Sequence, residues 1–330
     1  MTMKTIWTRR QYLGALGGTI LALQGGLTES HSAEKRIRKL IVPQGPGGTV
    51  DIIGRAFTDF IQQSGKTPTI TENKPGAAGE IAADYVARSP ADGMTLLVGN
   101  SSTMVVNPQV KKVRYDPLRD FQCLGGIVLA DTIMVANASL GFKTLNDVIS
   151  YARAHPGKLA FASNGVGGAF HLGMEYFQAL TGTKLLHVPF NSAAQAELAL
   201  VSNQVALMIA NTGPVVEFIR KGKVTPLAVV GEKPSIDLPN LVIASHIIPG
   251  FVVNTWVAVY APAATPENTA VQLNSTLNKY LKDPRGKTLF QRQGLIPIPG
   301  TLTDAARWNR QEMKTWGKIV DAVKARGAIS

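Results

Sequence analysis

Two glycine-rich turns of the same spacing restrict the fold of this chain more than any other feature. The first lies in IVPQGPGGTVDIIGR (residues 41–55) and the second in SNGVGGAFH (residues 163–171). The glycines that share the spacing, 120 residues apart (165 minus 45), are Gly45, Gly47 and Gly48 in the first turn and Gly165, Gly167 and Gly168 in the second. Each turn stands between a strand-like run and a helical pattern, where unpaired N–H groups and the helix dipole favour an anion. Two such turns that face each other would hold one anionic ligand between two lobes.

The first turn does not match either of the common nucleotide-binding loops. The dinucleotide pattern G-x-G-x-x-G is met at Gly45 and Gly47, but Val50 stands where the third glycine allows close packing of helix and strand. The phosphate-binding pattern G-x-x-x-x-G-K-[ST] fails at SGKT (residues 64–67), because Phe60 replaces its first glycine. The sequence therefore predicts an anion site without naming a nucleotide.

Strand-like runs alternate with helical patterns along most of the chain, which predicts an α/β protein with mainly parallel sheets. The strand-like runs are RKLIVPQ, PTITEN, TLLVGN, KLAFAS, LLHVPF, VALMIAN and VTPLAVVG. Helices are expected over residues 50–64, 80–88, 266–282 and 303–326, and one after Thr144, which would be its N-cap. Met313, Trp316, Val320 and Val323 fall on one face of the last helix, which we interpret as a packing stripe.

Two long extended runs interrupt this alternation, one over Gln122–Asn137 and one over Phe251–Pro266. They predict a pair of hinge strands that cross between two lobes of a clamp. The expected organisation is an export signal at 1–33, a first lobe made of 34–129 and 254–330, and a second lobe made of 130–253. At 330 residues and 45% hydrophobic composition, the chain can build both cores.

The N-terminus has the layout of an export signal: a basic start, a weakly apolar stretch near residues 13–26 and small polar residues before Glu34. TRRQYLG (residues 8–14) resembles the twin-arginine motif, with Arg9 and Arg10 as the paired arginines; an ordinary secretory signal is the alternative. Either route predicts a periplasmic protein. Cys123 is the only cysteine, so an intramolecular disulfide is excluded.

The formal net charge is +12, and removal of residues 1–33, which carry Lys4, Arg9, Arg10 and Glu29, leaves about +10. A basic protein attracts anions. Lysine and arginine are scattered, without the runs and interleaved aromatic residues of a nucleic-acid surface, so we expect no nucleic-acid partner. Small acidic solutes or an acidic partner surface therefore remain as candidates for the binding partner. The alternative is that the positive charge serves only the solubility of the protein.

The sequence offers no catalytic or metal-binding constellation. The histidines beyond the signal are His155, His171, His187 and His246, and none falls at zinc spacing with a second ligand. GNSST approaches the G-x-S-x-G elbow but ends in Thr103. We therefore expect a binding protein without metal or cofactor, and not an enzyme.

Candidate ligand-binding residues follow the strand ends and the two turns. Thr49 is expected both to cap its helix and to donate a hydroxyl, and Asp51 either complements the helix dipole or points into the cleft. His171 is either a ligand contact or a solvated surface residue. Neutral side chains at strand ends suit a dehydrated carboxylate. The full candidate set is Gly47, Gly48, Thr49, Asp51, Asn73, Ser101, Ser102, Thr103, Ser163, Asn164, Gly165, Gly167, Gly168, His171, Phe190, Asn191 and Asn211.

Several longer segments resemble the periplasmic solute-binding family of tripartite tricarboxylate transporters, also called the Bug family. They include IVPQGPGGTVDIIGR, TENKPGAAGEIAADYVARSPADGMTLLVGN, YDPLRDF, HPGKLAFASNGVGGAFHLGMEYF, HVPF and WVAVYAPAATP, in the family's order over nearly the whole mature chain. E-N-x-P-G-A-x-G (residues 72–79) and P-A-D-G-x-T-L-L (residues 90–97) are the most specific. The resemblance implies a two-lobed Venus-flytrap fold that binds a small carboxylate through backbone N–H groups and water, without cofactor.

The chain departs from the family pattern in the second lobe, at Phe190–Gln195, at SNQVA (residues 202–206) and at PNLVIASHIIPG (residues 239–250). These departures leave the identity of the ligand open. The resemblance implies a monomer that captures a small organic carboxylate for the permease subunits of a tripartite tricarboxylate transporter. The alternatives are a ligand-sensing component that reports to a membrane sensor kinase, and a secreted α/β enzyme that acts on an acidic substrate.

Overall fold

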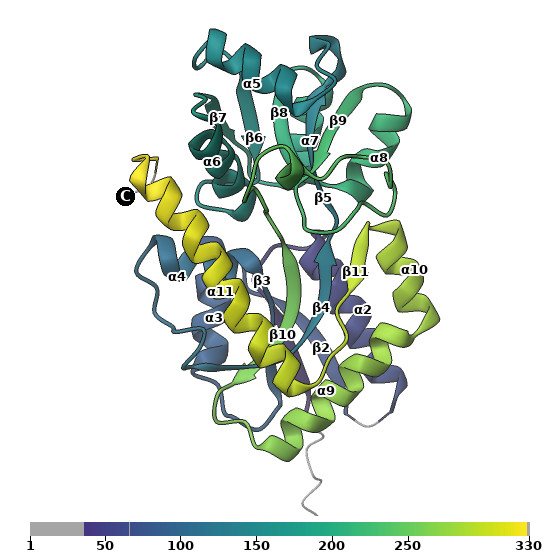
Figure 1. Ribbon diagram of the computed structural model, residues 1–330. Helices are drawn as coiled ribbons and strands as arrows, with labels where there is room; N and C mark the ends of the chain where they lie inside the picture. Colours follow the sequence, from purple (N-terminus) through teal and green to yellow (C-terminus); the bar gives the residue numbers. More distant parts are fainter. Residues whose placement is uncertain (1–35, 66, 329–330) are drawn as a thin grey trace, which may run out of the picture. The chain divides into compact units, whose positions relative to one another are not determined.

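Two separate β-sheets organise the chain, as the repeated alternation of strands and helices predicts (Figure 1). The computed structural model describes residues 36–65 and 67–328, and the chain from Ile37 onward forms one compact unit. The expected export signal at residues 1–33 lies outside the described residues.

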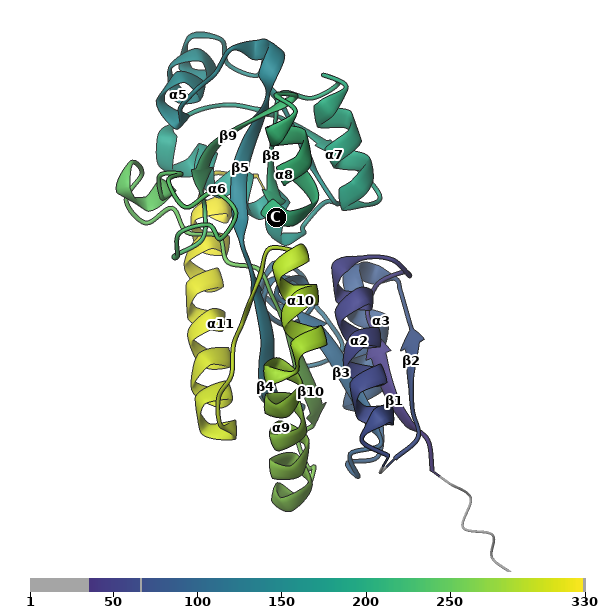
Figure 2. The ribbon, with the colours of Figure 1, turned by 90° about the vertical axis from the view of Figure 1, so that its right-hand side faces the viewer.

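The first sheet has six strands in the order β11-β4-β10-β3-β1-β2. Its strands are β1 (Arg38–Val42), β2 (Thr69–Asn73), β3 (Thr95–Asn100), β4 (Phe121–Ala130), β10 (Trp256–Pro262) and β11 (Leu295–Pro297). The helical segments around it are α2 (Thr49–Gln63), η1 (Ala77–Gly79), α3 (Glu80–Ala87), η2 (Ser102–Val106), α4 (Asn107–Val110), α9 (Glu267–Lys282), α10 (Pro284–Arg292) and α11 (Leu302–Ala325). The turned view shows α11 and α9 on opposite sides of β4 (Figure 2).

The second sheet has five strands in the order β7-β6-β8-β5-β9. Its strands are β5 (Thr132–Asn137), β6 (Ala160–Ser163), β7 (Leu186–Pro189), β8 (Leu207–Asn211) and β9 (Val224–Val229). Its helical segments are η3 (Ala138–Leu140), α5 (Leu145–Ala154), α6 (Ala169–Thr181), α7 (Ala193–Val201), α8 (Thr212–Arg220) and η4 (Ala244–His246). Each strand-like run expected from the sequence forms one of these strands.

Both sheets are mixed rather than mainly parallel. β1 pairs in parallel with β2 and β3, and β6 pairs in parallel with β7 and β8, as the β-α-β pattern predicts. β10 runs antiparallel to β3 and β4, and β5 runs antiparallel to β8 and β9. The reason is that β10 and β5 each follow a crossing between the sheets. Each therefore enters its sheet in the direction opposite to its neighbours, and no β-α-β connection makes it parallel to them.

The helix boundaries follow local capping chemistry. Thr144 caps α5 through a capping box with Asp147, which confirms the expected N-cap, and Thr301 and Asp304 do the same for α11. Thr49 is not a cap: the N-cap of α2 is Gly48, and Thr49 is the first helical residue. Helix α10 is not among the helices expected from the sequence; it begins at Pro284, directly after the cap residue Asp283.

The two extended runs form shorter strands than expected. The run at residues 122–137 is divided into β4 and β5 at Asp131, and the run at residues 251–266 forms a strand only over β10. The two crossings lie side by side, because the Ala130 N–H donates to the Thr255 carbonyl over 2.8 Å. Asp131 is buried and accepts hydrogen bonds from Ser235 Oγ at 2.6 Å and from the Ile236 N–H at 3.0 Å, which fixes the first crossing in place.

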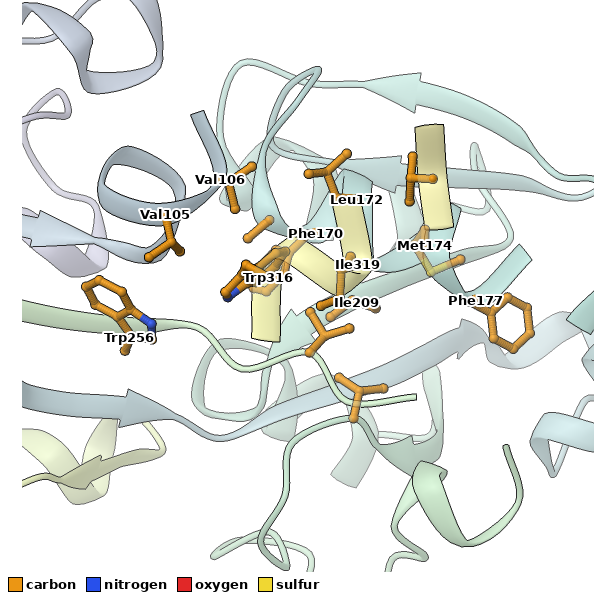
Figure 3. Packing of buried hydrophobic residues seen from close by; sticks show 14 of the residues in the cluster. Val105, Val106, Phe170, Leu172, Met174, Phe177, Ile209, Trp256, Trp316 and Ile319 are labelled. Carbon is orange, nitrogen blue, oxygen red and sulfur yellow. The ribbon is translucent and has the colours of Figure 1, made fainter. Parts of the chain in front are cut away.

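The C-terminal helix α11 packs against elements of both sheets. Its expected stripe is confirmed: Trp316, Val320 and Val323 are buried, and Met313 packs against the same cluster. Figure 3 shows Trp316 and Ile319 of α11 among buried side chains of α6 and of the η2 segment. At its C-terminal end, the Arg326 guanidinium donates to Gln178 Oε1 of α6 over 3.0 Å. One continuous hydrophobic core therefore joins both sheets through this helix.

Candidate functional site

A cavity of about 580 Å³ is lined by residues that come from both sheets. The lining residues on the side of the first sheet come after the ends of β1 and β3 and include Gly48, Thr49, Ser101 and Ser102. The lining residues on the side of the second sheet lie at or after the ends of β6, β7 and β8 and include Asn164, Gly165, Gly168, Phe190, Asn191 and Asn211. The two halves of the protein touch at this place, because the Ala169 N–H donates to Ser102 Oγ over 3.3 Å. The cavity therefore lies where carboxyl ends of strands meet, as expected for a ligand site in an α/β protein.

The two glycine turns have nearly the same backbone geometry. Gly48 has φ −77° and ψ 164° and is the N-cap of α2, while Gly168 has φ −73° and ψ 164° and is the N-cap of α6. The preceding residues, Gly47 with φ 86° and Gly167 with φ 76°, occupy the left-handed region that favours glycine. Each turn thus brings a helix N-terminus to the cavity wall, where an anion is stabilised.

Each turn is also held by the residue four positions after its left-handed glycine. The Gly47 N–H donates to Asp51 Oδ2 over 2.9 Å, and the Gly167 N–H donates to His171 Nδ1 over 3.2 Å. Both supporting side chains are buried and neither lines the cavity. Asp51 and His171 therefore position the turns rather than contact the space between them.

Asp51 stands at the centre of a small polar network. Its carboxylate accepts from Arg55 Nε at 3.0 Å and from Asn73 Nδ2 at 2.8 Å, in addition to Gly47. Burial by itself would raise the pKa of Asp51, but the hydrogen bonds from Arg55, Gly47 and Asn73 together lower it below its ordinary value. Asp51 is thus a structural anion that does not face the ligand space.

His171 belongs to a buried stack of rings. His171 and His187 lie with ring centroids 4.0 Å apart, and His187 also stacks on Phe161. His187 Nε2 lies 2.7 Å from Ser163 Oγ. Burial lowers the pKa of both histidines to about 4, aided for His171 by the neighbouring His187. Both rings are neutral at physiological pH, so His171 Nδ1 is free to accept the Gly167 N–H.

Among the described residues, none that lines the cavity carries an ionisable side chain. The wall consists of glycine, proline and alanine backbone, of serine, threonine, asparagine and glutamine side chains, and of apolar groups such as Val128, Phe170 and Trp256. A bound anion would be held by N–H and hydroxyl donors instead of by a cation. Within the described residues, no group of three or more histidine, cysteine, aspartate or glutamate side chains could hold a metal ion.

A third turn at the cavity was missed in the candidate residues. Gly76, Ala77, Ala78 and Gly79 all have positive φ, and Gly76, Ala78 and Gly79 line the cavity. Asn107 Nδ2 donates to the Ala78 carbonyl over 2.7 Å, which holds this strained turn. The sequence feature that could have predicted this turn is the P-G-A-x-G part of the segment at residues 72–79, where two glycines flank two alanines.

The structure brings ten of the candidate residues to the cavity wall: Gly48, Thr49, Ser101, Ser102, Asn164, Gly165, Gly168, Phe190, Asn191 and Asn211. The other seven lie behind the wall or beside it: Gly47, Asp51, Asn73, Thr103, Ser163, Gly167 and His171. Asn73 donates to the Gln44 carbonyl, and Thr103 Oγ1 lies 3.4 Å from the Ala78 carbonyl, so both support cavity-lining segments. His171 is 5% exposed, so the alternative of a solvated surface histidine is wrong.

The family profile described as "Tripartite tricarboxylate transporter family receptor" matches residues 53–325. The chain belongs to this receptor family. Protein BugT of Bordetella pertussis is 31% identical over 291 residues, which cover 87% of this chain and 89% of that protein. A protein encoded in the tcbD-tcbE intergenic region of Pseudomonas sp. strain P51 is 30% identical and covers 92% of each chain.

Solved structures of similar proteins share the fold. An R. palustris protein with adipate superposes with a TM-score of 0.80 at 29% identity, covering 88% of this chain and 98% of its own. MatC from Rhodopseudomonas palustris with bound malate superposes with a TM-score of 0.77 at 27% identity, and the match covers 86% of this chain and 99% of that chain. The two-lobed α/β fold expected from the sequence is thereby confirmed, and the chain is a member of a solute-binding receptor family.

Proposed function

We propose that this receptor captures a small organic carboxylate in the cavity between its two sheets and delivers it to the permease subunits of a tripartite tricarboxylate transporter. The observation that carries the proposal is the matched pair of helix N-termini, at Gly48 and Gly168, on the wall of one cavity without ionisable side chains. Such a site suits an anion that exchanges water for N–H and hydroxyl donors. Relatives solved with adipate and malate support the same ligand class.

The proposal extends to the molecule's organisation and location. We place the lobe boundaries at 129/130 and 253/254, close to Asp131 and Thr255, where the chain crosses between the sheets. The receptor would act as a monomer in the periplasm after removal of residues 1–33, exported by the twin-arginine or the general secretory route. Among residues 36–65 and 67–328, none of the helices combines the length and the apolar composition of a membrane-spanning segment.

The test of the ligand class is a thermal-shift and calorimetric screen with adipate, malate and benzoate, followed by two variants at one position. Gly48→Asp places a carboxylate on the cavity wall, while Gly48→Asn adds a neutral side chain of the same shape. Both should fold, since the backbone at Gly48 is extended and its added Cβ would lie 3.5 Å from Gln44 Oε1, an ordinary contact. We expect Gly48→Asp to weaken binding of the acid found in the screen about a hundredfold or more, by charge repulsion in a confined site.

Gly48→Asn is the matched control, and its loss of affinity should be clearly smaller. Equal losses in the two variants would mean that the anion does not sit at this helix N-terminus. A screen in which only nucleotides or neutral sugars stabilise the wild-type protein would contradict the carboxylate class itself.

A further inference from the structure

A buried carboxyl group is hydrogen-bonded to a residue of the cavity wall. Glu312 of α11 is 6% exposed, and its Oε2 accepts a hydrogen bond from Trp256 Nε1 at 2.8 Å. Within residues 36–65 and 67–328, no lysine, arginine or histidine forms an ion pair with Glu312. A buried carboxylate in such surroundings is costly, because water and counter-charge are both missing.

Trp256 connects this carboxyl group to the ligand space. It lies at the start of β10, lines the cavity and is 2% exposed. Its ring packs against Trp308 of α11 with centroids 4.8 Å apart, and Tyr260 OH donates to Asn309 Oδ1 over 2.8 Å. Glu312 is therefore hydrogen-bonded to a residue of the cavity wall, and the Trp308 contact and the Tyr260–Asn309 bond hold α11 and β10 together beside it.

The charges around Glu312 increase the cost of its ionised form. Burial is the main reason that the pKa of Glu312 rises to about 7; the Trp256 N–H lowers it, and the neighbouring carboxylate of Glu232 raises it. Tyr260 on β10 also lies near Glu312, and burial first, with the Glu312 charge adding to it, raises the pKa of this phenol, so it stays neutral. Glu312 thus changes its charge near neutral pH while it is hydrogen-bonded to a residue of the cavity wall.

We infer that capture of an anionic ligand by this receptor is coupled to the uptake of a proton by Glu312, so that binding is tighter in the acid form. The inference rests on the proposed function, since it requires an anion in the cavity. The reason is that an anion in a cavity lined by Trp256 and a carboxylate hydrogen-bonded to Trp256 repel each other through a medium of low dielectric. Linkage is reciprocal: the anion favours protonated Glu312, and protonated Glu312 favours the anion.

The test measures proton uptake directly. Binding of adipate and of benzoate is followed by titration calorimetry near pH 7 in phosphate and in Tris, two buffers with very different ionisation enthalpies. Both acids are essentially ionised there, so any proton taken up belongs to the protein. We expect a fractional proton uptake by the wild-type receptor and none by Glu312→Gln, whose amide keeps an acceptor for the Trp256 N–H. Between about pH 6 and pH 8 the wild-type Kd should rise up to about tenfold, equal to 1.4 kcal/mol, while that of Glu312→Gln stays flat.

Trp256→Phe gives a second, independent readout. It keeps an aromatic ring at the cavity but removes the N–H that stabilises ionised Glu312, so the midpoint of the pH dependence should move to higher pH. Equal proton uptake in the wild type and Glu312→Gln, or an unchanged midpoint in Trp256→Phe, would overturn the inference while leaving the carboxylate receptor intact. If the wild type binds neither acid at any pH in this range, the inference fails together with the proposed ligand class.

Discussion

At the scale of single residues, the site depends on side chains that stand behind the cavity and hold its backbone in place. Asp51 and His171 occupy equivalent positions, 120 residues apart (171 minus 51), and each accepts the N–H of a left-handed glycine. One is an anion and the other a neutral imidazole, so what the two turns share is a buried acceptor. The chemistry presented to a ligand is therefore set by backbone groups, while the side chains fix their direction.

We expect Asp51→Asn to destabilise the protein by about 2–3 kcal/mol, because the amide is uncharged and has only one accepting oxygen, so the bonds from Arg55, Gly47 and Asn73 cannot all be kept in this buried network. The lowered pKa of Asp51 means that its contribution is present at neutral pH and is lost as the pH falls through that pKa. The difference between wild type and variant in urea denaturation should therefore shrink in acid. Asp59→Asn, an exposed position on the same helix, is the matched control and should change stability by less than about 0.5 kcal/mol.

At the scale of elements, the turn of η1 shows how a strained segment is held at the cavity. Four successive residues, Gly76 to Gly79, have positive φ, and two of them are alanines. Such a backbone persists only where the surroundings hold it. Here Asn107 and Lys111 donate to the carbonyls of Ala78 and Ala77. The segment from α4 onward thus supports a cavity wall that lies about thirty residues earlier in the chain.

Gly79→Ala should be far more damaging than an alanine at another left-handed glycine. A Cβ at Gly79, with φ 96°, would lie 2.3 Å from Thr103 Oγ1 and 3.0 Å from Pro43 Cβ, so the turn or its support must move. Gly182 also has positive φ, 64°, but a Cβ there meets open space. We expect a loss of about 3 kcal/mol or more for Gly79→Ala and about 1 kcal/mol for Gly182→Ala, measured by chemical denaturation. Similar losses would show that the turn tolerates displacement.

At the scale of the whole molecule, the cavity exists because three separate connections bring the two sheets together. Two are the crossings near Asp131 and Thr255, and the third is α11, whose buried face reaches the core beside α6. The hydrogen bonds from Trp256 and Tyr260 to Glu312 and Asn309 tie α11 to β10, and Arg326 ties it to α6. A change in the angle between the lobes must therefore be accommodated by this helix as well as by the crossings.

Ligand binding should protect both glycine turns from hydrogen exchange at the same time. With the acid identified in the screen, peptides covering residues 44–50 and 164–170 should both exchange more slowly, because both segments contribute residues to the wall of one cavity. A peptide from α5 (Leu145–Ala154), which contributes no lining residue, should be unaffected and serves as the control. Slower exchange in only one of the two turns would place the ligand on a single lobe.

The sequence by itself determined the elements and the two turns. Hydrophobic periodicity and glycine spacing are local properties, so β1, β6 and the helices that follow them could be read directly, as could the buried stripe of α11. The same local chemistry identified Thr144 as a cap. The family resemblance, carried by contiguous motifs, pointed to the receptor fold for the same reason.

Only the tertiary structure decided which residues face the cavity. Asp51, Asn73 and His171 follow strand ends or glycine turns, as a ligand contact would, yet packing turns Asp51 and His171 toward glycine N–H groups and Asn73 toward Asp51. Glu312 and Trp256 lie 56 residues apart, and no local pattern could reveal that they form one buried pair behind the site. Sequence fixes the order of groups along the chain, whereas burial and orientation depend on contacts between segments that meet only after folding.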